Sequence, residues 1–246
     1  GNLLEEMTED FNASQDDYRV TPSYRGNYTE TMTGAIAAFR AGEQPHILQV
    51  FEVGTGTMMN ADGAIYPVYE LMEAHGRAFD PDAFLPAVVG YYTDTNGNML
   101  SFPFNSSTPI MYYNRDVFEA AGLDPEQPPQ TWEELAEQAT QITESGAARC
   151  GFTSSWPSWV MLENFSAMHN SPLGTLENGF GGLETELNFN NDLVARHWDN
   201  LKAWQDAGAY KWGGPGSGPD AEPMFYSQEC AIFFGSSASR ADVAAN

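Results

Sequence analysis

The sequence predicts an α/β fold, because segments with helical periodicity alternate along the chain with short apolar runs rich in β-branched and aromatic residues. Hydrophobic residues make up 42% of the chain and aromatic residues 13%, enough for a packed core, so a disordered chain is excluded. At 246 residues the chain is long enough for one large domain or two ordinary ones. Since no apolar run approaches the roughly 20 residues that cross a bilayer, we expect no transmembrane helix.

The first fifty residues predict two helices and a strand. An extended run at 18–24 separates the helices, and the second, at 29–41, ends at Gly42, a favourable C-terminal cap. HILQVF (46–51) consists mostly of residues that favour β-structure, so we expect a buried strand there. The first helix is indicated by apolar residues at helical spacing, namely Leu3, Leu4, Met7 and Phe11.

Prolines and a turn signal punctuate the middle of the chain. Pro67 and Pro81 stand where prolines occur in the first turn of helices. Asn96 and Gly97 predict a tight turn, as in a hairpin. The stretch NSSTPIMYYN (105–114) opens with three hydroxyl residues and continues as an apolar run, which we expect to be a strand buried on both faces.

A capping box is the clearest local signal in the second half. A short helix is expected at 116–121, closed by Gly122. In QPPQTWEEL, Thr131 can cap a helix while Glu134 reaches back three residues, so a helix should run to about residue 144.

The last third predicts one long helix, a loop and a terminal helix. GGPGSGP (213–219) is a loop, too short to link domains, and a helix is expected from residue 237 to the end. The long helix, at 192–207, is amphipathic, with a stripe formed by Leu193, His197, Leu201 and Trp204.

The two cysteines leave two interpretations open. Cys150 and Cys230 each begin a strand-like run, CGFT and CAIFF, 80 residues apart. In an exported protein they could pair, but this spacing alone neither establishes nor excludes a disulfide. The sequence holds no CxxC motif and no Cys/His cluster, so it predicts no metal site.

The charge of the chain is strongly acidic. Asp and Glu number 34 against 10 Lys and Arg, for a formal net charge of −24. A field of this sign repels phosphate backbones, which makes nucleic acid an unsuitable partner. Such a surface suits a salty medium, where repulsion is screened over about 3 Å at 1 M salt, so we expect a marine or halophilic source and exposure to outside salt. The alternative is an ordinary acidic protein.

Several enzyme and cofactor motifs are absent or incomplete. GTGTMM (54–59) has Met59 in place of the third glycine of a dinucleotide loop, although it could form a helix N-terminus. DTNGN (94–98) fails as a calcium loop, because Met99 and Asn105 stand at the positions that need Gly and Glu. No G-x-S-x-G elbow is present. Acidic residues are too abundant to identify a catalytic pair, and the histidines show no ligand spacing: His46, His75, His169 and His197.

Three features indicate a polar binding site. Glu52 follows the expected strand 46–51, at the strand end where ligands of open α/β sheets bind, although taken alone this residue is better explained as a solvated loop acid. Trp156 and Trp159, in SSWPSW, could stack on a ligand or pack in the core. SSASR (236–240) again places small hydroxyl residues beside a buried strand, AIFF. Two such clusters predict an oxyanion site lined by hydroxyls and helix N-termini.

Longer motifs show a family resemblance. YYNRDVFEAAGLDPEQPPQTWEELAEQA resembles the signature of family 1 extracellular solute-binding proteins of ABC importers. Finer motifs resemble the branch of that family that binds sn-glycerol 3-phosphate: YRGNYTETMTGAIAAFRAGEQPHILQVFEVGTGTMM, PFNSSTPIMYYN, WPSWVMLENFSA and FYSQECAIFFGSSAS. The similarity extends over essentially all 246 residues.

The resemblance implies a ligand site and a role for each residue. Tyr28 would donate its hydroxyl to the ligand, and Glu52 would accept hydrogen bonds from the glycerol hydroxyls. Ser107 and Ser236 would help to hold the phosphate. The two tryptophans would pack on the glycerol moiety. The family pattern also uses a Gly, a Tyr and an Arg that we expect beyond the end of this sequence.

The resemblance also implies a two-lobed periplasmic binding protein fold of type II, here incomplete at both ends. Residues 1–104 would form the first lobe, lacking its first strand and its C-terminal part. Residues 105–114 would form a hinge crossover strand, and 115–246 a second lobe truncated at its C-terminal end. The sequence begins without Met and both ends fall within expected helices, so we expect a fragment of an exported protein whose signal peptide is not included.

The implied function is capture without chemistry. A monomeric periplasmic protein would bind sn-glycerol 3-phosphate, glycerophosphodiesters such as glycerophosphocholine, or both. It would need no cofactor and would deliver the ligand to the permease subunits of an ABC importer, supporting phosphate uptake. Two alternatives are a binding protein of the same fold for a sugar such as a maltodextrin, and a glycerophosphodiester hydrolase, for which neither a metal motif nor a nucleophile–base pair is visible.

Overall fold

The computed structural model describes residues 2–59, 61, 63–77, 80–215 and 219–246. The chain divides into two compact units, Gly1–Phe102 and Pro103–Asn246, and each is described by itself. The fold is mixed α/β, as the sequence predicts.

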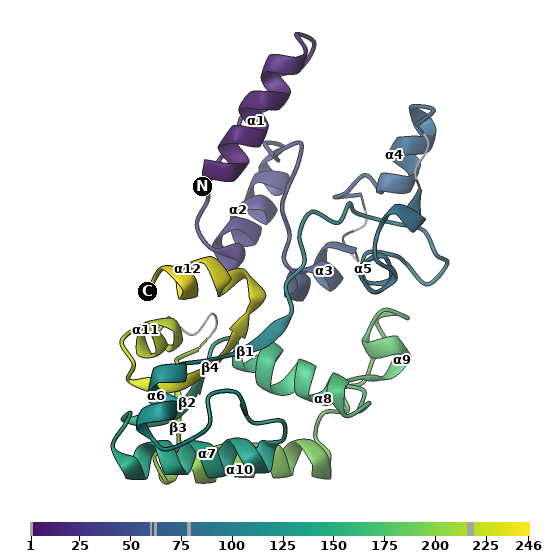
Figure 1. The fold of residues 1–246 in the computed structure, drawn as a ribbon. Helices are drawn as coiled ribbons and strands as arrows, with labels where there is room; N and C mark the ends of the chain where they lie inside the picture. The colour runs from purple at the N-terminus through teal and green to yellow at the C-terminus, as the bar shows by residue number, and fades with distance from the viewer. Residues whose placement is uncertain (1, 60, 62, 78–79, 216–218) are drawn as a thin grey trace. The chain divides into compact units, whose positions relative to one another are not determined.

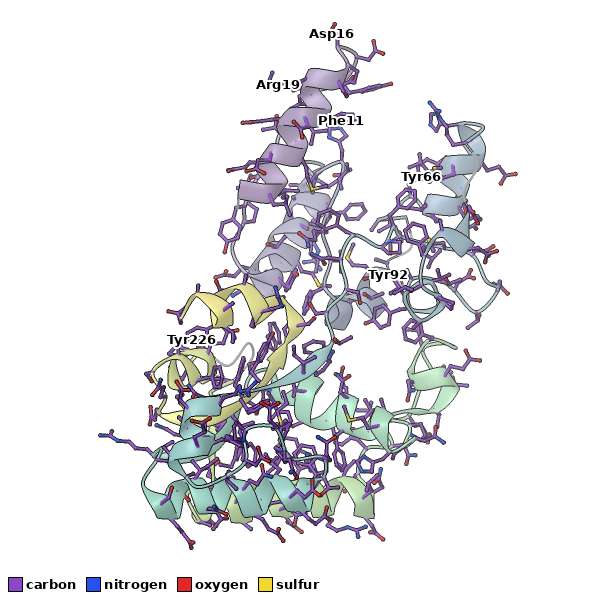
Figure 2. All side chains as sticks on the ribbon, viewed as in Figure 1. Phe11, Asp16, Arg19, Tyr66, Tyr92 and Tyr226 are labelled. Carbon is purple, nitrogen blue, oxygen red and sulfur yellow. A yellow bond between two sulfur atoms is a disulfide. The ribbon has the colours of Figure 1, made fainter. Side chains whose placement is uncertain are left out.

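The described part of the first unit is helical, with many apolar side chains exposed to solvent. Phe11 on α1 and Tyr66 before α4 are 44% and 56% exposed, and both are labelled in Figure 2. Among the described side chains, the buried apolar ones include Val68 and Met99. The helices are α1 (Asn2–Ser14), α2 (Tyr28–Ala41), α3 (Glu52–Met59), α4 (Val68–Ala74), η1 (Pro81–Ala83) and α5 (Pro86–Tyr91).

The first two predicted helices are confirmed, and α2 is well capped. Gly42 adopts the left-handed conformation (φ 73°) that closes a helix. At the other end, the Asn27 side chain accepts a hydrogen bond from the Glu30 N–H, and the Glu30 carboxylate accepts one from the Asn27 N–H. This capping box fixes the point at which α2 begins, directly before Tyr28.

The predicted buried strand HILQVF (46–51) is wrong. These residues form a bend and irregular chain, and Ile47 is 81% exposed. β-propensity describes how well a side chain fits a pleated, half-buried surface, and a strand also needs a hydrogen-bonded neighbour. In the described part of this unit, no extended segment pairs with residues 46–51. The GTGTMM stretch that follows lies within α3.

The smaller signals of the first unit are confirmed with slight shifts. Pro67 stands just before α4, and Pro81 opens η1. The turn at Asn96 and Gly97 joins an antiparallel bridge, and the Gly97 N–H donates to the Asp94 carbonyl at 3.0 Å. Burial acts to raise the pKa of Asp94, but hydrogen bonds from Asn98 and Asn96 to its carboxylate together outweigh burial and lower the pKa. Asp94 therefore closes a turn.

The second unit is built on a four-stranded mixed sheet in the order β1-β4-β2-β3. β1 runs antiparallel to β4, while β2 is parallel to both β4 and β3. The carboxyl ends of β2, β3 and β4 therefore meet the start of β1 at one edge of the sheet. The strands are β1 (Pro109–Tyr113), β2 (Cys150–Ser154), β3 (Tyr210–Trp212) and β4 (Cys230–Ser236).

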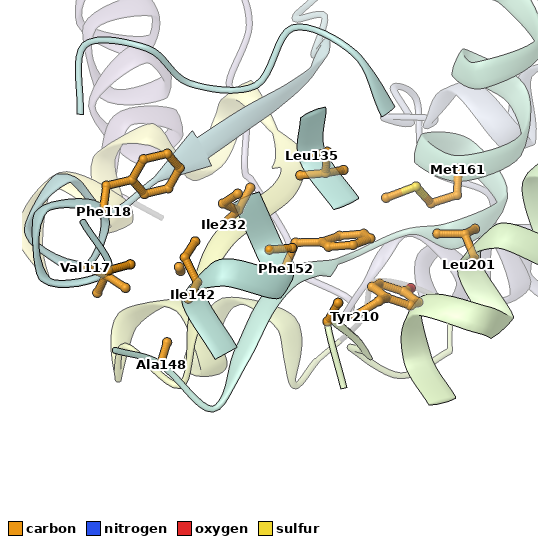
Figure 3. Packing of buried hydrophobic residues seen from close by; sticks show 14 of the residues in the cluster. Val117, Phe118, Leu135, Ile142, Ala148, Phe152, Met161, Leu201, Tyr210 and Ile232 are labelled. Atoms are coloured by element: carbon orange, nitrogen blue, oxygen red, sulfur yellow. The ribbon is translucent and has the colours of Figure 1, made fainter. Parts of the chain in front are cut away.

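Helices cover both faces of this sheet (Figure 1). On one face, Phe152 contacts Trp204 of α10, and Phe234 contacts Trp132 of α7. Figure 3 shows the buried cluster on which these residues pack, with Phe152 labelled. Phe233 packs against α11 on the other face. The helices are α6 (Arg115–Ala120), α7 (Trp132–Ser145), the π-helix η2 (Ser158–Asn164), α8 (Phe165–Met168), α9 (Thr175–Asn178), α10 (Asp192–Asp206), α11 (Ala221–Tyr226), η3 (Ser237–Ser239) and α12 (Arg240–Ala245).

β1 exists as predicted, but it is not buried on both faces. Its residues are partly buried or exposed, and Ile110 is 37% exposed. The reason is its place in the sheet, because β1 is an edge strand and, within the described residues, pairs with β4 alone. The apolar run PIMYY has the composition of a central strand, and composition alone does not give strand order.

The helix signals of the second unit are largely confirmed. Thr131 caps α7 by accepting from the Glu134 N–H, but the Glu134 carboxylate accepts from the Gln130 N–H rather than from Thr131. On α10 the predicted stripe is correct in its centre, where His197 and Leu201 are buried. The predicted loop 213–219 falls partly outside the described residues. The terminal helix is divided into η3 and α12.

The structure joins Cys150 and Cys230 in a disulfide, with Cα atoms 4.6 Å apart. The two residues are register partners at the amino ends of β2 and β4. Both are buried. The bridge thus links two neighbouring central strands at their amino ends, on the side of the sheet away from their carboxyl ends.

Candidate functional site

The two hydroxyl clusters of the sequence meet at the carboxyl-end edge of the second unit's sheet. Ser236 is the last residue of β4 and pairs with Pro109, the first residue of β1. One residue further out, the Ser237 N–H donates to the Thr108 carbonyl at 2.9 Å. The chain therefore brings Ser107, which is partly buried, next to the end of β4.

The hydroxyls of this edge are prepared to donate. The Oγ of Ser236 accepts from the Ala238 N–H at 3.0 Å, and the Oγ of Ser237 accepts from the Thr108 N–H at 3.1 Å. A serine hydroxyl carries one proton, so each of these oxygens keeps its O–H for another acceptor. Hydroxyl donors beside the start of the short helix η3 suit an acceptor such as an oxyanion.

A tyrosine fixes the backbone of this corner. The Tyr112 hydroxyl donates to the Ser236 carbonyl at 2.9 Å. Burial, followed by the nearby Glu222 carboxylate, raises the pKa of Tyr112, so the phenol remains a protonated donor at neutral pH. Tyr112 stacks on Phe233, with ring centroids 5.7 Å apart. The backbone of Ser236 is thus fixed by the hydroxyl of a packed aromatic side chain.

The tryptophans follow β2 at the same edge. The Ser155 N–H donates to the Phe234 carbonyl at 3.0 Å, which places Trp156 beside the end of β4. Trp156 has a left-handed backbone (φ 47°), a conformation that costs energy in a bulky residue and is concentrated at functional sites.

Trp159 lies in the π-helix η2, a rare element that is also frequent at functional sites. The Asn164 side-chain amide donates to the Trp159 carbonyl at 2.6 Å, and the Val160 N–H donates to the Trp156 carbonyl at 2.7 Å. Both indoles are partly buried and pack against the core cluster, leaving part of each ring exposed.

The remaining two predicted site residues belong to the first unit. Tyr28 is the first residue of α2 and stacks on Phe51, with ring centroids 5.1 Å apart and planes 8° apart. Glu52 follows Phe51 and opens α3, while its side chain lies outside the described part of the structure. The segments carrying Tyr28 and Glu52 are therefore adjacent within this unit.

The structure thus brings the predicted residues Ser107, Ser236 and Trp156 to one sheet edge, with Trp159 one turn later. Sequence analysis did not identify three supporting residues, Ser237, Tyr112 and Asn164. Ser237 was visible in the SSASR motif, since a hydroxyl after a strand can bond to backbone groups. The roles of Tyr112 and Asn164 depend on partners 124 and 5 residues away, which no local pattern indicates.

Two further properties bear on the kind of site. In the part of the chain that the structure describes, no three His, Cys, Asp or Glu side chains are grouped so that they could hold a metal ion. Among the helices that the structure describes, none is long and apolar enough to cross a membrane.

Comparison with known proteins identifies a family. Residues 1–246 match the family described as bacterial extracellular solute-binding protein. The sn-glycerol-3-phosphate-binding periplasmic protein UgpB of Rhizobium meliloti (strain 1021) is 47% identical over 242 residues, covering 98% of this chain and 56% of that protein. UgpB of Yersinia pestis bv. Antiqua (strain Antiqua) is 44% identical over 244 residues, covering 99% and 55%. The chain therefore spans about half the length of the curated relatives it matches.

Solved structures agree in fold. UgpB from Mycobacterium tuberculosis in complex with glycerophosphocholine has a TM-score of 0.80 and 19% identity, over 98% of this chain and 60% of that one. The cyclic α-maltosyl-1,6-maltose binding protein from Arthrobacter globiformis has a TM-score of 0.74 and 19% identity, over 100% and 59%. At these identities the likeness shows the two-lobed solute-binding fold and leaves the ligand open.

Proposed function

The chain belongs to the bacterial extracellular solute-binding proteins, and we propose that the complete gene product captures sn-glycerol 3-phosphate and glycerophosphodiesters for an ABC importer. The observation that carries this proposal is the 44% to 47% identity, along 98% to 99% of the chain, with curated sn-glycerol-3-phosphate-binding periplasmic proteins. The sugar-binding protein compared above and the solved UgpB structure are each 19% identical to this chain. The curated relatives at 44% to 47% identity are therefore what favours the glycerophosphate branch.

The geometry of the second unit supports a phosphate-binding role for Ser107 and Ser236. Both lie at the edge where β1 starts and β4 ends, and the Ser236 hydroxyl retains its proton for an acceptor. Hydrogen bonds to a charged oxygen contribute about 1.5 to 3 kcal/mol each, roughly twice a neutral one. Each serine would then contribute about tenfold or more to phosphate affinity.

The other contacts complete the proposed site. The partly exposed rings of Trp156 and Trp159 would cover the glycerol carbons, where apolar contact adds affinity without charge. Tyr28 would donate to the ligand, and Glu52 would accept from the glycerol hydroxyls. Together these groups bind a phosphate and a diol, and none of them needs to carry out chemistry.

We extend the proposal to domain organisation and partners. Residues 1–104 would belong to one lobe and 115–246 to the other, with 105–114 as a hinge crossover. A ligand that contacts both lobes favours the closed state, because it binds that state better. The closed, monomeric protein would then deliver its ligand to permease subunits from the periplasm.

The test is a ligand panel on the complete gene product in high-salt buffer, followed by tryptophan fluorescence. The ligands are sn-glycerol 3-phosphate, glycerophosphocholine and maltose. A saturable change with the glycerophosphates alone is expected. A response to maltose only, or to none of the three, would overturn the assignment. Release of free choline from glycerophosphocholine during incubation would instead support a hydrolase.

A further inference from the structure

The hydrogen-bond ladder between β1 and β4 continues beyond the strands themselves. The Asn114 N–H donates to the Ala231 carbonyl, and in an antiparallel pair hydrogen-bonded partners recur at every second residue. Counted along this register, the hydrogen-bonded pairs end with Thr108 and Ser237, which lie just beyond the strands at the sheet edge that carries the proposed site. A regular pair exchanges two backbone hydrogen bonds, one in each direction.

The Thr108–Ser237 pair makes only one of these bonds through the backbone. The Ser237 N–H donates to the Thr108 carbonyl at 2.9 Å, as the ladder requires. The reciprocal bond would need the Ser237 carbonyl, but that carbonyl accepts from the Arg240 N–H, because the chain turns into η3 at this residue. The backbone at the end of β4 thus provides no carbonyl acceptor for the Thr108 N–H.

The Ser237 side chain supplies the missing acceptor. Its Oγ lies 3.1 Å from the Thr108 nitrogen and takes the place of the backbone carbonyl. Ser237 is only partly buried, so the bond is a modest one, of about 1 kcal/mol net. Its importance lies in its position, since the Thr108 amide directly follows Ser107.

We propose that Ser237 is a positioning residue, whose hydroxyl completes the β1–β4 ladder and so holds Ser107 at a fixed distance from Ser236. The proposal rests on the proposed function, in which those two serines share one phosphate. Donors that are held in place lose less freedom when the ligand binds. Loss of the Ser237 hydroxyl should therefore weaken phosphate binding through Ser107, and not only lower stability.

The test uses three variants of the complete gene product. Ser237→Ala removes the hydroxyl, Ser237→Thr keeps a hydroxyl at the same position, and Ser106→Ala removes an exposed hydroxyl of the same cluster as a control. Affinity for sn-glycerol 3-phosphate is measured by calorimetry. We expect about fivefold weaker binding for Ser237→Ala, the factor that corresponds to about 1 kcal/mol, and changes below twofold for the other two.

Two further measurements separate positioning from general stability. Exchange of the Thr108 amide proton should become about fivefold faster in Ser237→Ala and stay unchanged in Ser237→Thr. In a Ser107→Ala background, Ser237→Ala should cost no further affinity, because the two residues act through one contact.

The outcomes distinguish this inference from the proposed function. If the wild-type protein binds no glycerophosphate, the proposed function fails, and the role of Ser237 in binding fails with it. If the wild type binds and Ser237→Ala binds equally well, only the role of Ser237 is overturned. Unchanged Thr108 exchange, or a full fivefold loss persisting in the Ser107→Ala background, overturns it as well.

Discussion

The disulfide between Cys150 and Cys230 gives a stability prediction of definite size. Replacing both residues, as Cys150→Ala with Cys230→Ala, opens a loop with a sequence separation of 80 residues. The chain-entropy relation for a loop of that length gives about 4.5 kcal/mol at 25 °C, and measured losses of native disulfides are about 2 to 5 kcal/mol. We therefore expect the free energy of unfolding to fall by about 4 kcal/mol.

The assay is urea unfolding of the complete gene product, followed by tryptophan fluorescence. All six tryptophans of this chain lie in residues 103–246, the unit that contains the disulfide. Wild-type protein with its disulfide reduced serves as a second sample, because reduction opens the loop without removing the sulfur atoms. Both samples should lose a similar amount of stability, and a loss below about 1 kcal/mol in both would refute the reasoning.

Ligand affinity should respond differently from stability. The bridge joins β2 and β4 at their amino ends, whereas the proposed site lies at their carboxyl ends. The six residue steps from Cys230 to Ser236 span about 20 Å of extended strand. Below the unfolding transition, the doubly substituted protein should bind glycerophosphate within about twofold of wild type. A tenfold loss would show that the bridge shapes the site.

Three further predictions concern pH, an aromatic contact and salt. Burial lowers the pKa of His197 to about 4, so between pH 6.5 and 4 the unfolded chain binds a proton that the folded chain does not. Over that range, the free energy of unfolding of the wild type should fall by about 3 kcal/mol more than that of His197→Gln. Urea midpoints that change in parallel for the two proteins would contradict this. Trp159→Ala should weaken glycerophosphate binding about 30-fold, whereas the control Trp198→Ala, 41% exposed on α10, should stay within threefold; equal titration curves would remove Trp159 from the site. With a net charge of −24, stability should rise from about 0.1 to 1 M NaCl as the screening length falls from about 10 to 3 Å, and a flat urea midpoint would argue against salt adaptation.

The parts of the fold that the sequence predicted correctly are those with local causes. Thr131 accepts a hydrogen bond from the amide three residues later, and Gly42 adopts the left-handed conformation of a C-terminal cap without strain. The start of α7 and the end of α2 can therefore be predicted from a few neighbouring residues. HILQVF shows the opposite case, because strand formation depends on a partner that the pattern does not contain. Likewise, the exposure of β1 follows from its place at the edge of the sheet, which strand composition does not encode.

The candidate site divides in the same way. Hydroxyl clusters next to apolar runs predicted that Ser107 and Ser236 face something polar, and the β1–β4 register brings their segments together. The support beneath them could not be predicted, since Tyr112 reaches Ser236 across 124 residues of sequence. The role of Ser237 is local in sequence but depends on the Arg240 amide occupying its carbonyl, which becomes visible only in the structure.

The most direct test of the account is a crystal structure of the complete gene product bound to sn-glycerol 3-phosphate. We predict phosphate oxygens within about 3 Å of the Ser107 and Ser236 hydroxyls, and the glycerol carbons against Trp156 and Trp159. A phosphate bound elsewhere, with these two hydroxyls facing solvent, would contradict the central claim that the two serine clusters form the phosphate site.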